Sequence, residues 1–178
     1  MTNLDGRIKA FHIGGDTTRL YMGGRLDCTK RESGGESRYS NGFRFGSDFE
    51  IKCSNIGIDL ESYTVVNPYA AFFAFLNTPE AHDYYSLGFI DLGLSPQFVE
   101  DYGIVSNSFV YRQAIRKKGV LCPVIGINKG GSNTENELRF LDSENRSSQD
   151  YFDGMLDFPF SQEDFTEVVE KVLNLRKL

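Results

Sequence analysis

The stretch that decides the fold is residues 120–142, VLCPVIGINKGGSNTENELRFLD. It opens with the apolar run VLCPVIGI (120–127), which is short, rich in β-branched residues and predicted to be a strand. The segment ELRFLD (137–142) is also predicted to be a strand, so the glycine-rich residues between the two form an expected hairpin loop. This pairing favours an antiparallel sheet.

The same loop must be tested as a phosphate-binding loop. That motif needs the pattern G-x-x-x-x-G-K-[ST], followed by a helix whose N-terminal amides face the phosphates. Here Lys129 precedes Gly130, Gly131 and Ser132, which reverses the required order, and the chain has no G-x-G-x-x-G pattern. Because a strand is expected after the loop, the sequence predicts no nucleotide phosphate site here.

The first third of the chain predicts strands. Residues 7–13 and 18–24 are short, apolar and separated by GGDT, which indicates a hairpin. Residues 43–53 and 56–66 show alternation of apolar and polar side chains and predict two further strands. The polar, glycine-rich segment 28–42 between them is expected to be a mobile loop.

Helical signals follow. Residues 67–77 begin with Asn-Pro, an N-cap followed by proline at the first helical position, and 96–102 follows a similar Ser-Pro start. Residues 107–119 carry basic side chains before a closing glycine. The segment 161–178 has a serine cap, with Asp164 near the capping-box position, and an apolar face.

The chain length of 178 residues suits a single globular domain over 1–178. The order of strands, helices, strands and a final helix predicts an α+β fold with a mainly antiparallel β-sheet and helices in the middle and at the C-terminus. A parallel component stays open around 120–127, because that strand follows a predicted helix.

Cysteine and histidine usage predicts no bound metal or cofactor. The three cysteines are widely spaced and form no C-x-x-C pair: Cys28, Cys53 and Cys122. The N-terminus MTNLDGRIKAF lacks the pattern of a secretion signal, and apolar runs stay far below the ~20 residues that span a bilayer. We therefore expect a reduced, cytoplasmic protein.

No catalytic motif stands out, so the chain is not expected to be an enzyme. His12 lies in a predicted strand and is expected to be a half-buried polar residue, while His82 is expected near an exposed helix start. One alternative stays open: a small-molecule enzyme with a pocket near His12, His82 or a cysteine. A structural or accessory interaction protein is a further alternative.

Charge falls into blocks along the sequence. Residues 53–111 contain no Lys or Arg, 112–132 contain five basic residues and no acid, and 133–170 contain 11 acids against two arginines. The last block is either a solvated face or a docking surface for a basic partner, and it disfavours direct binding of nucleic acid. Within it, residues 142–160 interleave acids with aromatic residues, as interface hot spots do, or place those aromatics in the core.

A small, acidic α+β chain of this character resembles the immunity proteins of bacterial contact-dependent growth inhibition systems. The resemblance rests on the whole chain and on no short motif. It implies a protein that binds and neutralises one cognate toxin domain, commonly a basic nuclease, by blocking its active site. The acids expected to face the toxin are Glu135, Glu137, Asp142, Glu144, Asp150, Asp153 and Asp157, with Asp83, Glu100 and Asp101 as second choices. Addition of a toxin strand to a sheet edge is an alternative mode.

Overall fold

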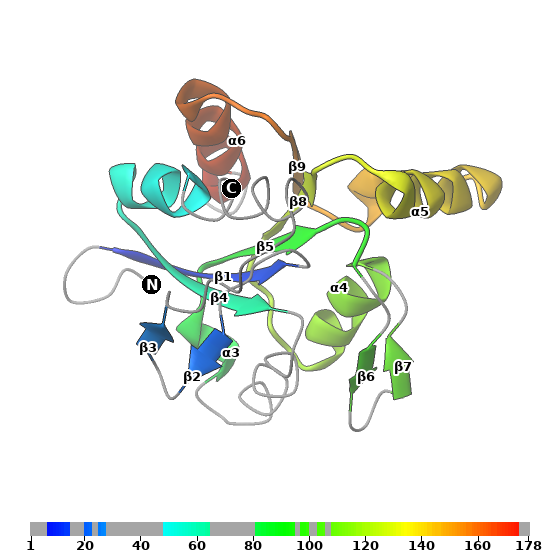
Figure 1. Ribbon diagram of the computed structural model, residues 1–178, viewed down its shortest axis with the longest axis horizontal. Helices are drawn as coiled ribbons and strands as arrows, with labels where there is room; N and C mark the ends of the chain where they lie inside the picture. The colour runs from blue at the N-terminus through cyan, green and yellow to red at the C-terminus, as the bar shows by residue number, and fades with distance from the viewer. Residues whose placement is uncertain are drawn as a thin grey trace, which may run out of the picture.

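The computed structural model describes residues 7–14, 20–22, 25–27, 48–64, 81–94, 97–99, 103–105 and 108–174. Its main sheet has five strands in the order β4-β1-β5-β8-β9 (Figure 1). The strands of this sheet are β1 (Ile8–Gly14), β4 (Ile58–Thr64), β5 (Leu87–Asp91), β8 (Val124–Asn128) and β9 (Gly154–Asp157). Every neighbouring pair runs parallel.

The prediction of a mainly antiparallel sheet is therefore wrong. β1 pairs with β4 on one side and with β5 on the other, so it does not form the predicted hairpin with residues 20–22. In the described part of the chain, antiparallel pairing is confined to two small two-stranded sheets. One joins β2 (Leu20–Met22) to β3 (Arg25–Asp27), and the other joins β6 (Gln97–Val99) to β7 (Gly103–Val105).

Two predicted strands are helices. The segment 137–142 belongs to α5 (Ser132–Ser143), in which Thr134, Leu138 and Leu141 turn inward at the spacing of a helix. Residues 48–55 also form a helix, which buries Phe49 and Cys53 one turn apart. The chain therefore runs from β8 through a loop and α5 to β9, as a parallel connection requires.

Other expectations are confirmed: β4 falls within 56–66, β8 largely within 120–127, and α4 (Ser108–Lys117) within 107–119. The C-terminal helix is α6 (Gln162–Asn174). The prediction of a helix at 96–102 is wrong for residues 97–99, which form the strand β6. The predicted helix at 67–77 and the predicted loop at 28–42 lie outside the described residues.

Counted along the chain, the strand order is 2-1-3-4-5, that of flavodoxin-like doubly wound sheets. Helices cover both faces of the sheet (Figure 1). The helix of residues 48–55 and α6 pack on one face, through Phe49, Phe165 and Val169. α4 and α5 pack on the other, through Ile115 and Leu141.

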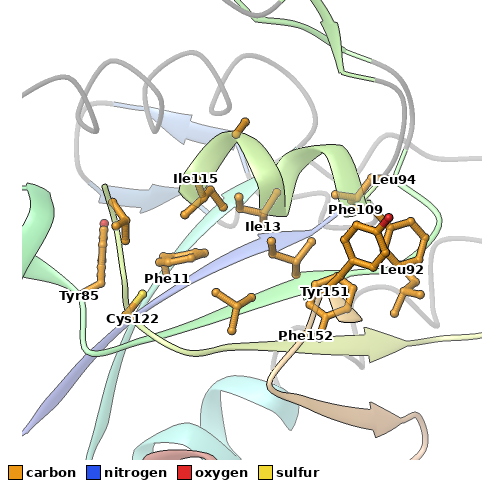
Figure 2. Packing of buried hydrophobic residues seen from close by; sticks show 14 of the residues in the cluster. Phe11, Ile13, Tyr85, Leu92, Leu94, Phe109, Ile115, Cys122, Tyr151 and Phe152 are labelled. Carbon is orange, nitrogen blue, oxygen red and sulfur yellow. The ribbon is translucent and has the colours of Figure 1, made fainter. Parts of the chain in front are cut away.

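On the α4 face, Phe11 and Ile13 of β1 pack beneath Ile115 and Phe109 of α4 (Figure 2). The Phe11 ring fills the space above Gly88 of β5, where a built Cβ would lie 2.2 Å from the ring Cζ. A side chain at position 88 would therefore displace the ring. The central strands β5 and β8 are buried almost throughout, as strands of parallel sheets usually are.

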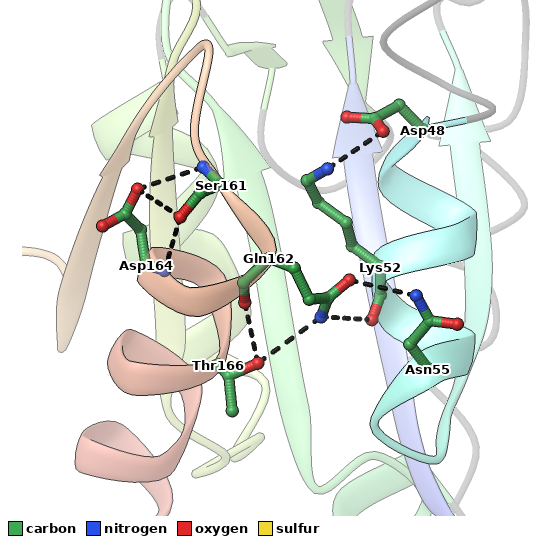
Figure 3. A network of polar contacts seen from close by, with 7 residues as sticks. All are labelled: Asp48, Lys52, Asn55, Ser161, Gln162, Asp164 and Thr166. Carbon is green, nitrogen blue, oxygen red and sulfur yellow. Dashed lines mark hydrogen bonds and ion pairs between the residues drawn. The ribbon is translucent and has the colours of Figure 1, made fainter.

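The opposite face is held by aromatic packing and by a polar bridge. The Phe49 ring meets those of Phe89 and Phe165 edge to face, with centroids 5.0 and 5.7 Å away. Near the start of α6, Gln162 Oε1 accepts a hydrogen bond from Asn55 Nδ2 at 3.1 Å, and Gln162 Nε2 donates to the carbonyl of Lys52 at 3.3 Å (Figure 3). These bonds join α6 to the helix of residues 48–55.

The predicted capping box of α6 is confirmed. The Asp164 amide donates to Ser161 Oγ at 3.0 Å, and the Ser161 amide donates to Asp164 Oδ2 at 3.0 Å (Figure 3). The hydrogen bonds from the Ser161 side chain and amide lower the pKa of Asp164, so the carboxylate remains available to the cap.

Candidate functional site

The candidate site lies at the carboxyl edge of the sheet, where the strand order reverses. β1 is followed along the chain by β4 on one side of it and then by β5 on its other side. In open α/β sheets, ligands bind outside the carboxyl ends of the strands at this switch point. Three charged or titratable side chains meet there: His12 near the end of β1, Asp91 at the end of β5 and Lys129 just after β8. We call these three residues the switch-point cluster.

One carboxylate joins the cluster. Asp91 Oδ1 lies 2.9 Å from His12 Nε2, and Asp91 Oδ2 lies 2.5 Å from Lys129 Nζ. The side chains of His12 and Asp91 are 2% and 1% exposed, and that of Lys129 is 12% exposed. Charged groups are seldom buried to this degree unless they are paired, so the cluster is a costly feature of the fold.

The surroundings keep Asp91 ionised. Burial alone would raise its pKa, but the charges of Lys129 and His12 and their hydrogen bonds outweigh burial and lower the pKa to about 2. An ionised carboxylate can only accept hydrogen bonds, so His12 Nε2 must be the donor of the pair. In the neutral imidazole, Nδ1 is then the nitrogen that can accept a proton.

Packing fixes the orientation of the imidazole. The Phe49 ring meets the His12 ring edge to face, with centroids 5.1 Å apart. On another side the cluster abuts Gly14, where a built Cβ would lie 2.7 Å from His12 Cε1 and 2.8 Å from Asp91 Oδ2. Glycine at position 14 is therefore required for this close approach of the backbone to the His–Asp pair.

Lys129 opens a glycine loop that leads into α5. Gly130 and Gly131 have φ angles of 74° and 95°, a conformation that favours glycine. Asn128 anchors the loop, because its Oδ1 accepts a hydrogen bond from the Gly130 amide at 2.9 Å and its Nδ2 donates to Asp157 Oδ1 at 2.8 Å. One reason for rejecting a phosphate loop from the sequence was wrong, since a helix follows this loop. The order of lysine and glycines still departs from the phosphate-loop motif.

Four of the seven first-choice acids have roles within the fold. Glu137 accepts hydrogen bonds from Gly93 and Ser108, and Asp157 accepts one from Asn128. Asp150 forms a capping box with Ser147 at the start of the short helix η1 (Ser148–Asp150). Asp153 accepts a hydrogen bond from the Val124 amide. These carboxylates stabilise the fold, which reduces the charge free to meet a partner.

Asp153 holds a buried arginine. Arg112 of α4 is 3% exposed and donates from Nη2 to Asp153 Oδ2 at 3.2 Å, while the Val124 amide donates to the same oxygen at 2.8 Å. Burial, with a smaller effect of the Arg116 charge, lowers the pKa of Arg112, and Asp153 opposes that shift. The pair therefore fastens α4 to the start of β8.

Four of the other predicted acids are exposed, and two lie outside the described residues. Glu135 and Asp142 on α5 and Glu144 at its C-terminal cap are exposed, and no hydrogen bond of their side chains occurs among the described residues. Asp83 is exposed on the short helix α3 (Ala81–Tyr84). Glu100 and Asp101 lie outside the described residues. The structure thus brings three of the predicted partner-binding acids together on and beside α5.

Four apolar residues of the segment 142–160 belong to the core. Tyr151, Phe152, Leu156 and Phe160 are at most 8% exposed. Of the two alternatives for residues 142–160, core packing therefore holds for these four side chains, and they are not anchors of an interface. The acids beside them remain outside, as that alternative requires.

The cysteine and histidine candidates differ in where they lie in the structure. Cys53 and Cys122 are both buried, and burial raises the pKa of Cys53, so its thiol stays protonated at neutral pH. His82 lies in α3, and Cys28 lies outside the described residues. Of the predicted catalytic candidates, His12 is the one placed in the switch-point cluster.

Sequence reasoning missed both partners of His12. Asp91 ends the apolar run LGFID and Lys129 follows the run VIGIN, each at the carboxyl end of a buried strand. A polar residue at such a position is a signal for a site in a parallel sheet. Because an antiparallel sheet was expected, the positions of these two residues did not indicate a site.

No family model matches this chain, and no curated protein matches it. One similar solved structure carries the description of a yeast Spc42 trimeric coiled coil fused to another structure, with 11% sequence identity and a TM-score of 0.55. The match covers 96% of this chain and 80% of that one. At this identity the likeness concerns the fold alone.

None of the helices in the described part of the chain is long and apolar enough to cross a membrane. Among the same residues there is no group of three or more His, Cys, Asp or Glu side chains that could hold a metal ion.

Proposed function

We propose that this chain is an enzyme that acts on a small anionic molecule of the nucleotide class at the carboxyl edge of its sheet. The observation that carries the proposal is the buried His12–Asp91–Lys129 cluster at the switch point. Doubly wound sheets bind dinucleotides or flavin mononucleotide at this position. Buried titratable groups with a perturbed pKa, such as Asp91, are a feature of functional sites.

The three side chains suit different roles in acid–base chemistry. His12 is the proton carrier, because imidazole is the side chain that most often transfers protons in enzymes and Asp91 holds its Nε2. Asp91 fixes the tautomer and orientation of the imidazole. Lys129 supplies positive charge beside a glycine loop, which suits a phosphate or carboxylate group of the substrate.

A binding experiment tests the proposal directly. AMP, NAD⁺, flavin mononucleotide and inorganic phosphate are titrated by calorimetry into the wild-type chain and into Lys129→Met and Asp91→Asn variants, with circular dichroism to verify folding. Lys171→Met is the matched control, since Lys171 is an exposed lysine on α6. We expect at least one nucleotide to bind the wild type and Lys171→Met, and to bind the two cluster variants tenfold or more weakly, a loss of about 1.4 kcal/mol.

Turnover is then followed by chromatography of the bound nucleotide. His12→Asn should abolish turnover and retain binding, because it removes the proton carrier and keeps a hydrogen-bond donor near Asp91. The proposal is rejected if none of the four probes binds the wild type, or if Lys129→Met binds as the wild type does.

A second candidate is the neutralisation of a toxin domain. It is supported by the exposed acids Glu135 and Asp142 of α5 and Glu144 at its C-terminal cap, and by Phe140 of the same helix, a ring that is 56% exposed. Exposed acids and an exposed aromatic residue on one helix suit contact with a basic protein surface. The partner is the cognate toxin domain, a basic nuclease as the resemblance implies.

Charge reversal separates this candidate from the first. Lys substitutions at Glu135, Asp142 and Glu144 should slow association with a toxin domain encoded beside the gene, while leaving nucleotide binding intact. The matched control reverses three exposed acids of α6: Glu163, Glu167 and Glu170. Equal association rates for the two triple variants would remove α5 from the binding surface.

A further inference from the structure

Glu137 is the most heavily bonded of the predicted surface acids. Its Oε2 accepts hydrogen bonds from the Gly93 amide at 3.0 Å and from Ser108 Oγ at 2.6 Å, and its Oε1 accepts one from the Ser108 amide at 3.1 Å. Ser108 is fully buried at the start of α4. Three donors from two separate segments therefore converge on one carboxylate.

One bonded segment, the loop at Gly93, and the helix that carries Glu137 each lie close in sequence to a residue of the switch-point cluster. Gly93 follows Asp91 by two residues, and α5, which carries Glu137, begins three residues after Lys129. The Leu92 amide also donates to the carbonyl of Ile127 at 2.8 Å, which continues the pairing of β5 with β8 beyond Asp91. Glu137 thus closes a bridge between the loop after β5 and the helix after β8.

The charge of Glu137 has a further effect at α4. A carboxylate at a helix N-terminus is stabilised by the amides of the first turn and by the helix dipole, and here it receives the Ser108 amide directly. The same carboxylate thereby holds three elements: the loop after β5, the start of α4 and the second turn of α5. An uncharged side chain would satisfy fewer of the donors.

We propose that Glu137 is a positioning residue for the switch-point cluster, which holds Asp91 against Lys129 by clamping the two segments that bear them. This inference rests on the proposed function for its biological meaning. The geometry that carries it belongs to the fold alone. Glu137 reaches the cluster through the backbone of Gly93 and through α5, and it touches no reacting group.

The experiment follows Asp91 itself, in the absence of any nucleotide. The carboxyl ¹³C resonance of Asp91 is recorded as the pH is lowered, in the wild type, in Glu137→Gln and in Glu135→Gln. Glu135→Gln is the matched control, because Glu135 lies on the same helix and is exposed. Glu137→Gln presents an amide N–H₂ group to the Gly93 or Ser108 donors, so the clamp should open on one side.

We expect Glu137→Gln to move the titration of Asp91 upward by about one pH unit, since Lys129 would no longer be held against the carboxylate. Glu135→Gln should titrate as the wild type does. An unmoved Asp91 titration in Glu137→Gln, with amide shifts of Gly93 and Ser108 showing that the clamp is open, would overturn the inference.

A second variant covers the case in which Glu137→Gln does not fold. Ser108→Ala removes the bond from Ser108 Oγ and leaves the carboxylate in place, and it should move the Asp91 titration in the same direction by a smaller amount. No movement in a folded Ser108→Ala protein would also overturn the inference. Because no ligand is used, failure of the nucleotide experiments leaves this result unaffected, so the two proposals fail separately.

Discussion

Replacing Asp91 by asparagine should remove a defined part of the acid sensitivity of this protein. Asp91 is 1% exposed and ionised, with a pKa lowered from 3.8 to about 2 by Lys129 and His12 against the opposing effect of burial. A carboxyl group whose pKa is lower in the folded state contributes stability above its unfolded pKa. That stability is lost as the pH falls through the folded pKa.

The size of this contribution follows from the two pKa values. The difference between 3.8 and about 2 corresponds to about 2 kcal/mol of unfolding free energy, all of it present at neutral pH. About 1 kcal/mol of it is lost by about pH 3, and most of it by about pH 2. Asp91→Asn cannot titrate, so its stability should fall less steeply over the same pH range.

Urea denaturation at neutral pH and at about pH 3 measures the effect. At neutral pH the variant should itself be less stable by about 3 kcal/mol, because the Lys129 charge loses its partner in a buried place. The informative quantity is the loss of stability between the two pH values, which should be about 1 kcal/mol smaller in Asp91→Asn. Asp83→Asn, at an exposed carboxylate, is the control. An equal acid loss in Asp91→Asn and the wild type would refute the reasoning.

Three further substitutions test the packing. Gly14→Ala should cost about 1–3 kcal/mol of unfolding free energy, because its Cβ enters the space of the switch-point cluster, and urea denaturation measures this loss. Arg112→Ala should cost about 3 kcal/mol by the same method, and the exposed Arg116→Ala less than about 0.5 kcal/mol; equal costs would contradict a role for the Arg112–Asp153 pair. Phe165→Ala should cost about 3–5 kcal/mol, and a loss below about 1 kcal/mol in thermal or urea unfolding would contradict the packing of α6 on the sheet.

Elements with local signals were predictable from the sequence. Ser161 and Asp164 predict the N-terminal cap of α6, and Phe165, Val169 and Val172 predict its apolar face. α4 ends as expected, with Arg116 and Lys117 in its last turn. These features depend on residues within one or two turns of each other, so a single sequence is sufficient.

The direction of the strands was not predictable in the same way. All five residues of β5 are buried, so the strand has no alternation and its signal is only a short apolar run. For ELRFLD, a window of six residues hides the helical period that Thr134, Leu138 and Leu141 show over the length of α5. Once α5 was taken for a strand, a hairpin and an antiparallel sheet followed.

The candidate site was predictable only in part. His12 was a catalytic candidate because histidine is rare in this chain, but the sequence placed it as an ordinary strand residue. Asp91 lies 79 positions further along the chain, so no local spacing links the two residues. Their meeting is a property of the strand order, which brings the ends of β1 and β5 side by side.

The long separation of the cluster residues has a consequence for the order of folding. When the chain emerges from its N-terminal end, the segments that form β1, β4 and β5 precede Lys129, which follows β8. A fragment that stops before β8 would have to bury Asp91 beside His12 without the ammonium group that lowers its pKa. Such a fragment is unfavourable for the electrostatic reason alone. The cluster therefore forms when the fourth strand is complete, and the protonation state of Asp91 can report when the first four strands of the sheet have assembled.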